Sequence, residues 1–238
     1  MAENYVALDL EMTGLRVKQD KILEIGAVKV AGNKIIEEFQ CLINPHIDVG
    51  EIVSSLTGIT DAMAKSGIEE NRAMEKLVAF CEGLPLVGHN ISFDFSFLKQ
   101  CAVNYNIKYE VSGIDTLKIA RKLLPDLPKK TLDYLCWYFE IKRKECHRAL
   151  EDAKAAHLLY LRLKKEFMNE HPAMFLERPL TFKVKKQCPI TEKQKKYLNQ
   201  LINYHRIDFN DEIDYLTRSE ASRITDRIIL TYGKMVKQ

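Results

Sequence analysis

The chain has 238 residues, of which 46% are hydrophobic and 29% are charged, a composition typical of a globular protein with room for one good-sized domain and an extension. No secretory signal pattern opens the chain and no apolar run reaches about 18 residues, so we expect no export and no membrane span, and a cytoplasmic location. The net charge of +3 is unevenly spread, since residues 1–180 carry 24 Lys and Arg against 26 Asp and Glu, and residues 181–238 carry 12 against 7.

Hydrophobic periodicity predicts an α/β sandwich built on a mixed sheet. Apolar runs predict five strands, at residues 5–10, 21–32, 34–43, 84–89 and 111–115. The second and third of them flank Asn33, which indicates a hairpin. Apolar residues at helical spacing predict short helices near 51–55 and after 60, and longer ones at 69–82, 93–105, 116–124, 131–139 and 149–167. Three strands followed by alternating helices and short strands favour helices packed on a mixed sheet.

The C-terminal part reads as a separate, basic helical region. We expect a first domain at residues 1–177, a linker at 178–190 and a small helical domain at 191–238. Two capping-box patterns, Thr191-x-x-Gln194 and Thr217-x-x-Glu220, mark the start of its helices. Lysines gather where the linker meets the first helix, at Lys183, Lys185, Lys186, Lys193, Lys195 and Lys196. They could neutralise phosphates of a polyanion, or they could be a solvated face or a surface that docks a protein.

Two carboxylates interrupt the first apolar strand, at Asp9 and Glu11 of the stretch VALDLEMTG. Side chains alternate along a strand, so both acids point to one face while Leu8, Leu10 and Met12 point to the other. Their like charges repel at a separation of roughly 6–7 Å. A metal ion between them would relieve that repulsion.

A third acid, Asp94, lies in the stretch GHNISFDFSFL. With Ser92 as the expected N-cap, it falls in the first turn of its helix, on the inward row of Leu98 and Cys101. An acidic residue is favoured in a first turn by the helix dipole alone, so this position has a purely structural explanation as well.

The fourth acid, Asp152, lies within the stretch ECHRALEDAKAAHLLYL at residues 145–161, most of which is expected to be helical. Asp152 aligns with its alanine-rich stripe, whereas Glu151 aligns with a mostly solvated face, so Asp152 is the inward carboxylate and needs a partner or a metal. A continuous helix would set His147 about 140° away from Asp152. Both reach one site only if His147 precedes the helix; otherwise it is an exposed histidine at a helix start.

Together these residues make a ligand set for two Mg²⁺ or Mn²⁺ ions. Four inward carboxylates supply the hard oxygen donors that these ions prefer. Two such ions roughly 3.5–4 Å apart can stabilise both the attacking and the leaving oxygen of a phosphodiester. An imidazole titrates near neutral pH and suits removal of a proton from water.

The order DLEMTG, GHNISFD and HRALED, with LTGIT at 56–60 and IDTLKIARKLLP at 114–125, resembles the DEDD exonuclease superfamily in its histidine variant. The likeness spans residues 5 to about 167 and is similar in particular to the proofreading exonucleases of bacterial DNA polymerase III, both the epsilon subunit and the PolC-type domain. It implies a ribonuclease-H-like fold and 3′→5′ release of nucleoside 5′-monophosphates from single-stranded DNA ends.

Residue roles follow from the resemblance by position. It implies that Asp9, Glu11, Asp94 and Asp152 bind the two metal ions and that His147 is the general base. It also implies that Met12, Thr13, Leu15 and Asn90 contact the terminal nucleotide.

Two other functions stay open. DLEMTGL is similar to the first motif of oligoribonucleases, although GHNISFDFSFL is not similar to their second motif, so an oligoribonuclease or RNA-trimming enzyme is the alternative. A non-catalytic nucleic-acid-binding module is a third reading, which the intact set of five residues disfavours. The partner we expect is a nucleic acid with a free 3′ end, bound by a protein that either acts alone or docks as a subunit of a polymerase or repair assembly.

Overall fold

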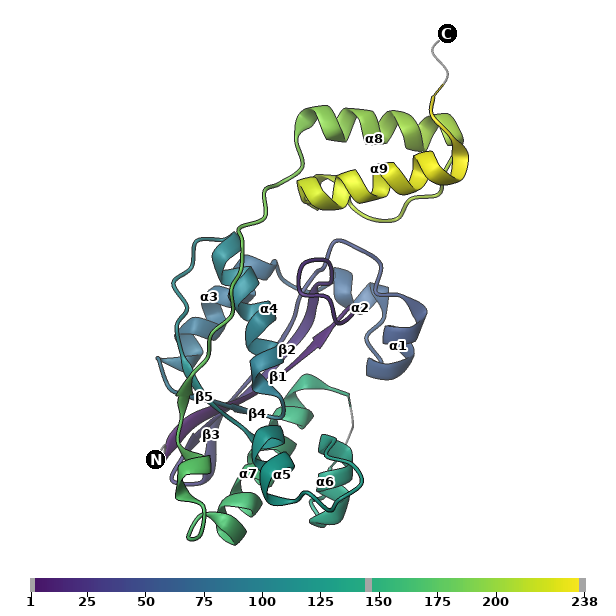
Figure 1. Ribbon diagram of the computed structural model, residues 1–238. Coiled ribbons are helices and arrows are strands. Elements are labelled where there is room, and N and C mark those ends of the chain that lie inside the picture. Colours follow the sequence, from purple (N-terminus) through teal and green to yellow (C-terminus); the bar gives the residue numbers. More distant parts are fainter. Residues whose placement is uncertain (1–2, 144–146, 236–238) are drawn as a thin grey trace. The chain divides into compact units, whose positions relative to one another are not determined.

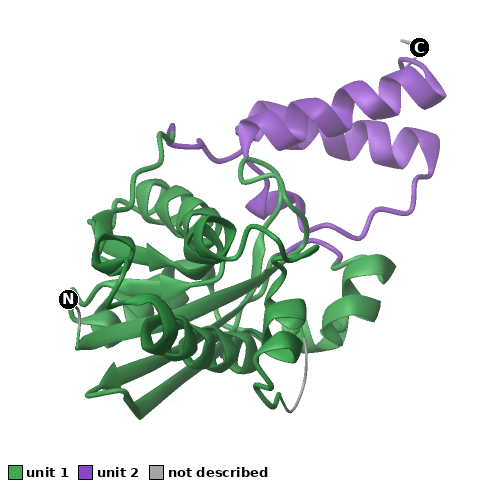
Figure 2. Cartoon of the chain, turned by 60° about the horizontal axis from the view of Figure 1, so that its bottom comes forward, with its two compact units in different colours: residues 1–45, 49–184 green, residues 46–48, 185–238 purple. Residues whose placement is uncertain are grey.

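The computed structural model describes residues 3–143 and 147–235. The chain divides into two compact units, drawn in different colours in Figure 2. The first unit comprises residues 1–45 and 49–184, and the second comprises residues 46–48 and 185–238. Each has its own cluster of buried hydrophobic side chains. Within the described ranges, no helix is long and apolar enough to cross a membrane.

A mixed six-stranded sheet forms the centre of the first unit (Figure 1). Its strands, in spatial order, are β3 (Lys34–Leu42), β2 (Ile22–Ala31), β1 (Asn4–Met12), β4 (Leu86–Gly88), β5 (Ser112–Asp115) and β6 (Arg178–Pro179). β1 pairs antiparallel with β2 and parallel with β4, and β5 is parallel to β4. The sequence predicted five strands. The sixth has two residues, includes a proline and lies in the stretch expected as a linker, so no apolar run marked it.

Seven α-helices are described in the first unit. They are α1 (Glu51–Thr57), α2 (Asp61–Lys65), α3 (Glu70–Cys81), α4 (Ile91–Asn104), α5 (Thr116–Leu123), α6 (Leu132–Tyr138) and α7 (Ala149–Phe167), with a 3-10 turn at Pro172–Phe175. The expected strand and helix order is confirmed, and the mixed sheet with flanking helices is the fold class that the periodicity predicted.

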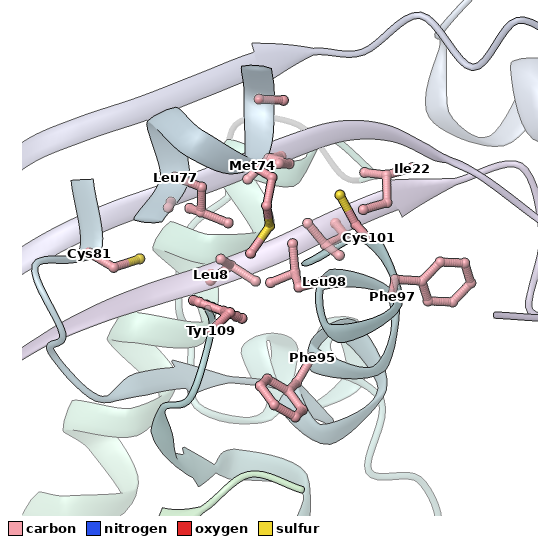
Figure 3. Packing of buried hydrophobic residues seen from close by; sticks show 14 of the residues in the cluster. Leu8, Ile22, Met74, Leu77, Cys81, Phe95, Phe97, Leu98, Cys101 and Tyr109 are labelled. Atoms are coloured by element: carbon pink, nitrogen blue, oxygen red, sulfur yellow. The ribbon is translucent and has the colours of Figure 1, made fainter. Parts of the chain in front are cut away.

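Both faces of β1 are buried, each against a different set of helices. Val6, Leu8 and Leu10 belong to a cluster with side chains of α3 and α4, part of which Figure 3 shows around Leu8, Met74 and Leu98. The alternate residues Tyr5 and Ala7 belong to a second cluster with side chains of α5, α6 and α7. A strand covered on both sides reads as a continuous apolar run, which explains why acids within it stand out.

The start of α4 differs from the expectation. The helix begins at Ile91, and Asn90, not Ser92, holds the N-cap position with φ 73° and no side-chain cap hydrogen bond. Asparagine tolerates this left-handed conformation better than most residues. The amide of Asn90 donates to Asp115 Oδ1 at 3.0 Å, so a residue at the end of β5 fixes the turn that opens α4.

The second unit is built from two helices, α8 (Glu192–His205) and α9 (Arg218–Tyr232), with a 3-10 turn at Ile213–Tyr215 between them. Both predicted capping boxes are present, at Thr191 with Gln194 and at Thr217 with Glu220. The helices pack through a small core, whose buried members are Ile190, Leu198, Leu201, Leu216, Ala221 and Ile228. Capping by side chains matters here because so small a core leaves little other support for the helix ends.

Candidate active site

Asp9 and Glu11 continue the face of β1 that carries Tyr5 and Ala7. They are the last two side chains on that face before the strand ends at Met12. The pKa of Asp9 is raised well above its ordinary value, first by burial and then by the charges of Asp94, Asp152 and Glu11. The three acids are therefore near enough to repel Asp9, as the strand periodicity and the two helix assignments had suggested.

Asp94 lies in the first turn of α4 and is 5% exposed. Its Oδ1 accepts a hydrogen bond of 3.1 Å from the backbone amide of Leu10, the residue between the two acids of β1. This contact ties the helix directly to the strand at the site. Burial raises the pKa of Asp94 to about 8, although its backbone hydrogen bonds oppose the rise.

Glu11, His147 and Asp152 converge at one point. One potential ligand atom from each lies within 4.8 Å of the other two. Asp152 is in the first turn of α7 and is 8% exposed. His147 lies two residues before the first residue of α7, at φ 59°. The structure thus places the histidine outside the helix, the arrangement that the two residues need to face one site.

Electrostatic repulsion defines this cluster. The pKa of Glu11 rises to about 7 because of burial and the neighbouring charges of Asp152 and Glu24. Burial also raises the pKa of Asp152, although the guanidinium of Arg143 opposes the rise. Arg143 contacts both Asp152 and Asp133 through ion pairs. Arg148 likewise opposes the rise at Glu11, yet the pKa values of Glu11 and Asp152 remain raised. Carboxylate oxygens that repel one another at a common point fit a bound divalent cation.

Comparison with known proteins places this geometry in a family. Residues 6–160 match the RNase_T exonuclease family. The chain belongs to this exonuclease family. The chain is 30% identical over 238 residues to the PolC-type DNA polymerase III of Caldanaerobacter subterraneus subsp. tengcongensis, a match that covers 95% of this chain and 17% of the relative. It is 37% identical over 169 residues to the PolC-type DNA polymerase III of Bacillus subtilis, covering 69% of this chain and 12% of the relative.

The chain therefore spans less than one fifth of the length of these relatives. Solved structures show the same fold. Exonuclease X in complex with 5′-overhanging duplex DNA superposes with a TM-score of 0.56 at 24% identity, over 68% of this chain and 92% of that one. Escherichia coli exonuclease I in complex with a dT13 oligonucleotide superposes with a TM-score of 0.63 at 18% identity, over 73% of this chain and 43% of that one. The sequence resemblance to DEDD exonucleases is confirmed.

Sequence reasoning missed Glu24, which holds the start of α7. Glu24 is 0% exposed and pairs with Glu11 across β1 and β2. Its Oε2 accepts a hydrogen bond of 3.1 Å from the amide of Ala149, and its Oε1 accepts one of 2.8 Å from Arg148. These bonds lower its pKa despite burial. A lone Glu between Leu23 and Ile25 carries no sequence signal for this role, because the residues that it holds at the start of α7, Arg148 and Ala149, lie more than a hundred residues away.

Gly26 lets α7 approach the sheet. A Cβ at this position would lie 2.0 Å from the backbone nitrogen of Leu150 and 2.1 Å from the carbonyl carbon of Ala149. Such separations are far below van der Waals contact, so the first turn of α7 rests on the main chain of β2 itself. The glycine therefore sets the distance between the first turn of α7, which carries Asp152, and the sheet, whose strand β1 carries Glu11.

A second anchoring residue, Asp115, holds the loop that leads to Asp94. Besides Asn90, its Oδ1 accepts from the amide of Leu117 at 3.0 Å and caps α5. His89 is held in turn by Thr116 Oγ1 at 2.9 Å and by the carbonyl of Lys130 at 2.7 Å. The stretch IDTLKIARKLLP was singled out by its resemblance alone. Its hydrogen bonds hold residues 89 and 90, which lie directly before the helix that carries Asp94.

The residues expected to contact substrate follow the strand end. Met12 is the last residue of β1 and packs partly buried against the core. Thr13 closes the next loop, since its Oγ1 accepts from the amide of Lys21 at 2.9 Å. Leu15 is 76% exposed, and Asn90 occupies the turn before α4. Their contact with a nucleotide stays a prediction.

Proposed function

We propose that the chain is a metal-dependent 3′→5′ exonuclease that releases nucleoside 5′-monophosphates from single-stranded DNA ends. One observation carries the proposal: Glu11, His147 and Asp152 bring side-chain oxygen and nitrogen atoms within 4.8 Å of one another. Asp9 and the buried Asp94 add two further carboxylates that interact with this cluster. Four acids and a histidine gathered beside two arginines, with the pKa values of the acids raised, are typical of a functional site.

The four acids Asp9, Glu11, Asp94 and Asp152 are proposed to hold two Mg²⁺ or Mn²⁺ ions. When bound, the ions would supply positive charge for the attacking and the leaving oxygen of the scissile phosphate. The carboxylates come from three elements, β1, α4 and α7, which the bonds of Leu10 to Asp94 and of Glu24 to Ala149 lock together. The donor set is therefore preorganised by backbone contacts rather than by the ions alone.

His147 is proposed to act as general base. It would accept a proton from the water whose oxygen forms the new bond to phosphorus, while the bond from phosphorus to the 3′ oxygen of the preceding nucleotide breaks. The departing oxygen takes a proton from solvent, which leaves a shorter strand with a new 3′ hydroxyl. His147 precedes α7 and lies with Glu11 and Asp152 at the same point, which supports this role.

The terminal nucleotide is proposed to lie against Met12, Thr13, Leu15 and Asn90. An exposed leucine beside a strand end can pack on a base without reading its identity. Single-stranded DNA is favoured because the relatives are DNA polymerases of the PolC type, and because solved neighbours carry DNA. The same relatives make a polymerase assembly the candidate protein partner. RNA is the alternative substrate, which the DLEMTG motif favours.

The test is digestion of matched end-labelled DNA and RNA oligomers, single- and double-stranded, with Mg²⁺, Mn²⁺ or EDTA. The proposal expects a ladder that shortens from the 3′ end of single-stranded DNA, nucleoside 5′-monophosphate as product, and no cleavage in EDTA. Faster digestion of RNA would assign the RNA-trimming activity instead. No digestion of any substrate with either metal would leave a binding module.

A further inference from the structure

One face of α8 in the second unit combines cations with aromatic rings. The buried side of this helix carries Leu198 and Leu201. Its exposed residues include a set spaced by three, four, seven and eleven positions, which places them within a sector of about 100°. This set, called the α8 face below, consists of Lys193, Lys196, Tyr197, Gln200 and Tyr204, all exposed.

The α8 face carries two lysines and no acidic residue. No Asp or Glu occurs between residues 193 and 207. Among the described residues, Lys193 and Lys196 form no ion pair, whereas Lys195 pairs with Glu192 at 3.2 Å and with Asp214 at 2.7 Å. The structure therefore removes Lys195 from the lysine cluster predicted from the sequence, because its charge is neutralised and it lies on another face of the helix.

The tyrosines of the α8 face are exposed without an evident structural need. Tyr197 is 38% exposed and Tyr204 is 50% exposed. The ring of Tyr204 is held edge-on by His205, with centroids 4.8 Å apart, and His205 contacts Tyr232 at 5.6 Å. A ring that is held in place but open to solvent loses little conformational entropy when it stacks on a ligand.

These features fit one ligand chemistry. Single-stranded nucleic acid offers phosphates to the two ammonium groups and flat bases to the two rings, and amide side chains such as Gln200 can bond either. Tyr197 and Tyr204 are seven residues apart, or about 10 Å along the helix, close to the length of three stacked nucleotides at about 3.4 Å each. A duplex would present phosphates but hide its base faces.

We propose that the α8 face binds single-stranded nucleic acid. Given the proposed function, the ligand is the strand whose 3′ end is hydrolysed, so the second unit adds affinity for substrates longer than the active site itself covers. The neighbouring helix α9 adds Arg223 and Arg227 to the exposed surface against one acid, Asp226, which keeps the charge of the unit favourable for a polyanion.

The experiment measures binding without cleavage. The chain of 238 residues, in EDTA, is titrated into 5′-fluorescein dT20, and anisotropy is followed at several salt concentrations. The Tyr197→Ala/Tyr204→Ala variant is expected to weaken binding about tenfold or more, since each stacked base contributes about that much. Tyr197→Phe/Tyr204→Phe keeps the rings and should bind like wild type.

The charge arm uses Lys193→Gln/Lys196→Gln. The slope of log Kd against log salt should fall by about 1.4, the value for two phosphate contacts on a single strand. Lys195→Gln/Lys234→Gln removes the same charge elsewhere on the unit, and its slope should change by less than half as much. Circular dichroism of each variant checks that the helices remain.

Three outcomes would overturn the proposal: unchanged affinity in the alanine variant, an equal loss in the phenylalanine variant, or equal slopes for the two lysine pairs. Unchanged affinity throughout would point to a protein partner on this face. The result is separable from the proposed function, because digestion of a short end-labelled oligomer by the wild-type protein is measured independently. If the protein digests the oligomer but the binding tests fail, the proposed function stands and only the role of the α8 face is rejected.

Discussion

The two units differ in which of their charged side chains are buried and which are exposed. In the first unit acids are drawn into the protein: Glu24, Asp94, Asp115 and Asp152 are all less than 10% exposed. In the second unit the buried charged residue among those described is Glu220, whose carboxylate accepts the amide of Thr217 at 2.7 Å and so meets the positive end of α9. Its cations, by contrast, stand on the outside.

The difference separates two tasks. Chemistry on a phosphodiester needs carboxylates held close together against their repulsion, and in the first unit a sheet with helices on both faces supports them. Binding a flexible strand needs cations and rings that stay accessible, and two capped helices suffice for it. Changes in the first unit should therefore alter both turnover and metal-free stability, and changes in the second should leave the acidic cluster untouched.

The largest effect is expected for Asp9→Asn. Loss of one ligand charge should lower turnover by roughly 10³-fold or more, since the metal contribution is several kcal/mol. The pKa of Asp9 is raised in the folded state, so its ionised form is disfavoured there and stability is lost as pH rises above the ordinary carboxyl range. At pH 7.5 in EDTA the variant should thus melt at or above the wild-type temperature.

Single-turnover digestion and thermal melts measure the two halves of that prediction. A variant that melts well below wild type, or that keeps near-normal turnover, would contradict the place given to Asp9. Asp61→Asn, which removes an acid from a helix of the first unit outside the cluster, is the control.

His147→Ala should lower turnover by roughly 10²–10⁴-fold, the usual contribution of a general base. Its effect on metal affinity should be small, because the four carboxylates carry the ligand role. Added imidazole should restore part of the rate in the variant, since a free base can occupy the vacated space. An absence of rescue together with a large loss of metal affinity would make the histidine a ligand instead.

Glu24→Ala tests how the first unit supports its acids. Removing this fully buried partner of Arg148 and Ala149 should lower the free energy of unfolding by about 3 kcal/mol or more, and should reduce turnover because α7 carries Asp152. Glu24→Gln keeps an acceptor for the amide of Ala149 and should recover part of both losses. Urea unfolding and steady-state kinetics on the two variants decide it; equal behaviour of Ala and Gln would mean that the hydrogen bond contributes nothing.

The pH dependence of metal-free stability should come from the first unit. Glu11 has its pKa raised to about 7 and Asp94 to about 8, so between about pH 4.5 and 8 the folded state binds more protons than the unfolded chain. Stability in EDTA should therefore fall as pH rises across this window. Mg²⁺ or Mn²⁺ should raise the melting temperature more at pH 8 than at pH 6. A flat profile in EDTA would mean that burial and mutual repulsion do not raise the pKa values of these acids.

The smallest effect is expected in the second unit. Thr217→Ala removes the hydroxyl that accepts the amide of Glu220 at 3.2 Å and should destabilise α9 by about 1 kcal/mol. Thr217→Ser, which keeps the hydroxyl, should be close to wild type. Circular dichroism melts of the two variants provide the measurement, and turnover on a short oligomer should not follow the loss.

Local sequence patterns predicted much of the fold and the direction in which several acids of the candidate site point. Period-two alternation set Asp9 and Glu11 on one face, and helix periodicity separated Asp152 from Glu151, because these properties depend only on neighbouring residues. The start of α4 was misplaced since Asp115, more than twenty residues on, fixes it. Glu24 was missed for the same reason. Lys195 was grouped with the other lysines of the basic cluster, and its ion pair with the distant Asp214 could not be predicted from sequence. The two-residue strand β6 is too short for any periodicity.

The direct seating of α7 on Gly26 has a mechanical consequence. A helix held off a sheet by side chains can slide by small rotamer changes, whereas contact between two main chains allows no such compliance. Asp152 is two residues beyond Leu150 and inherits that stiffness, while His147 lies on the other side of the contact in a turn outside the helix. The same short segment thus supplies one carboxylate on a helix that is fixed against the sheet and one histidine that lies outside that contact.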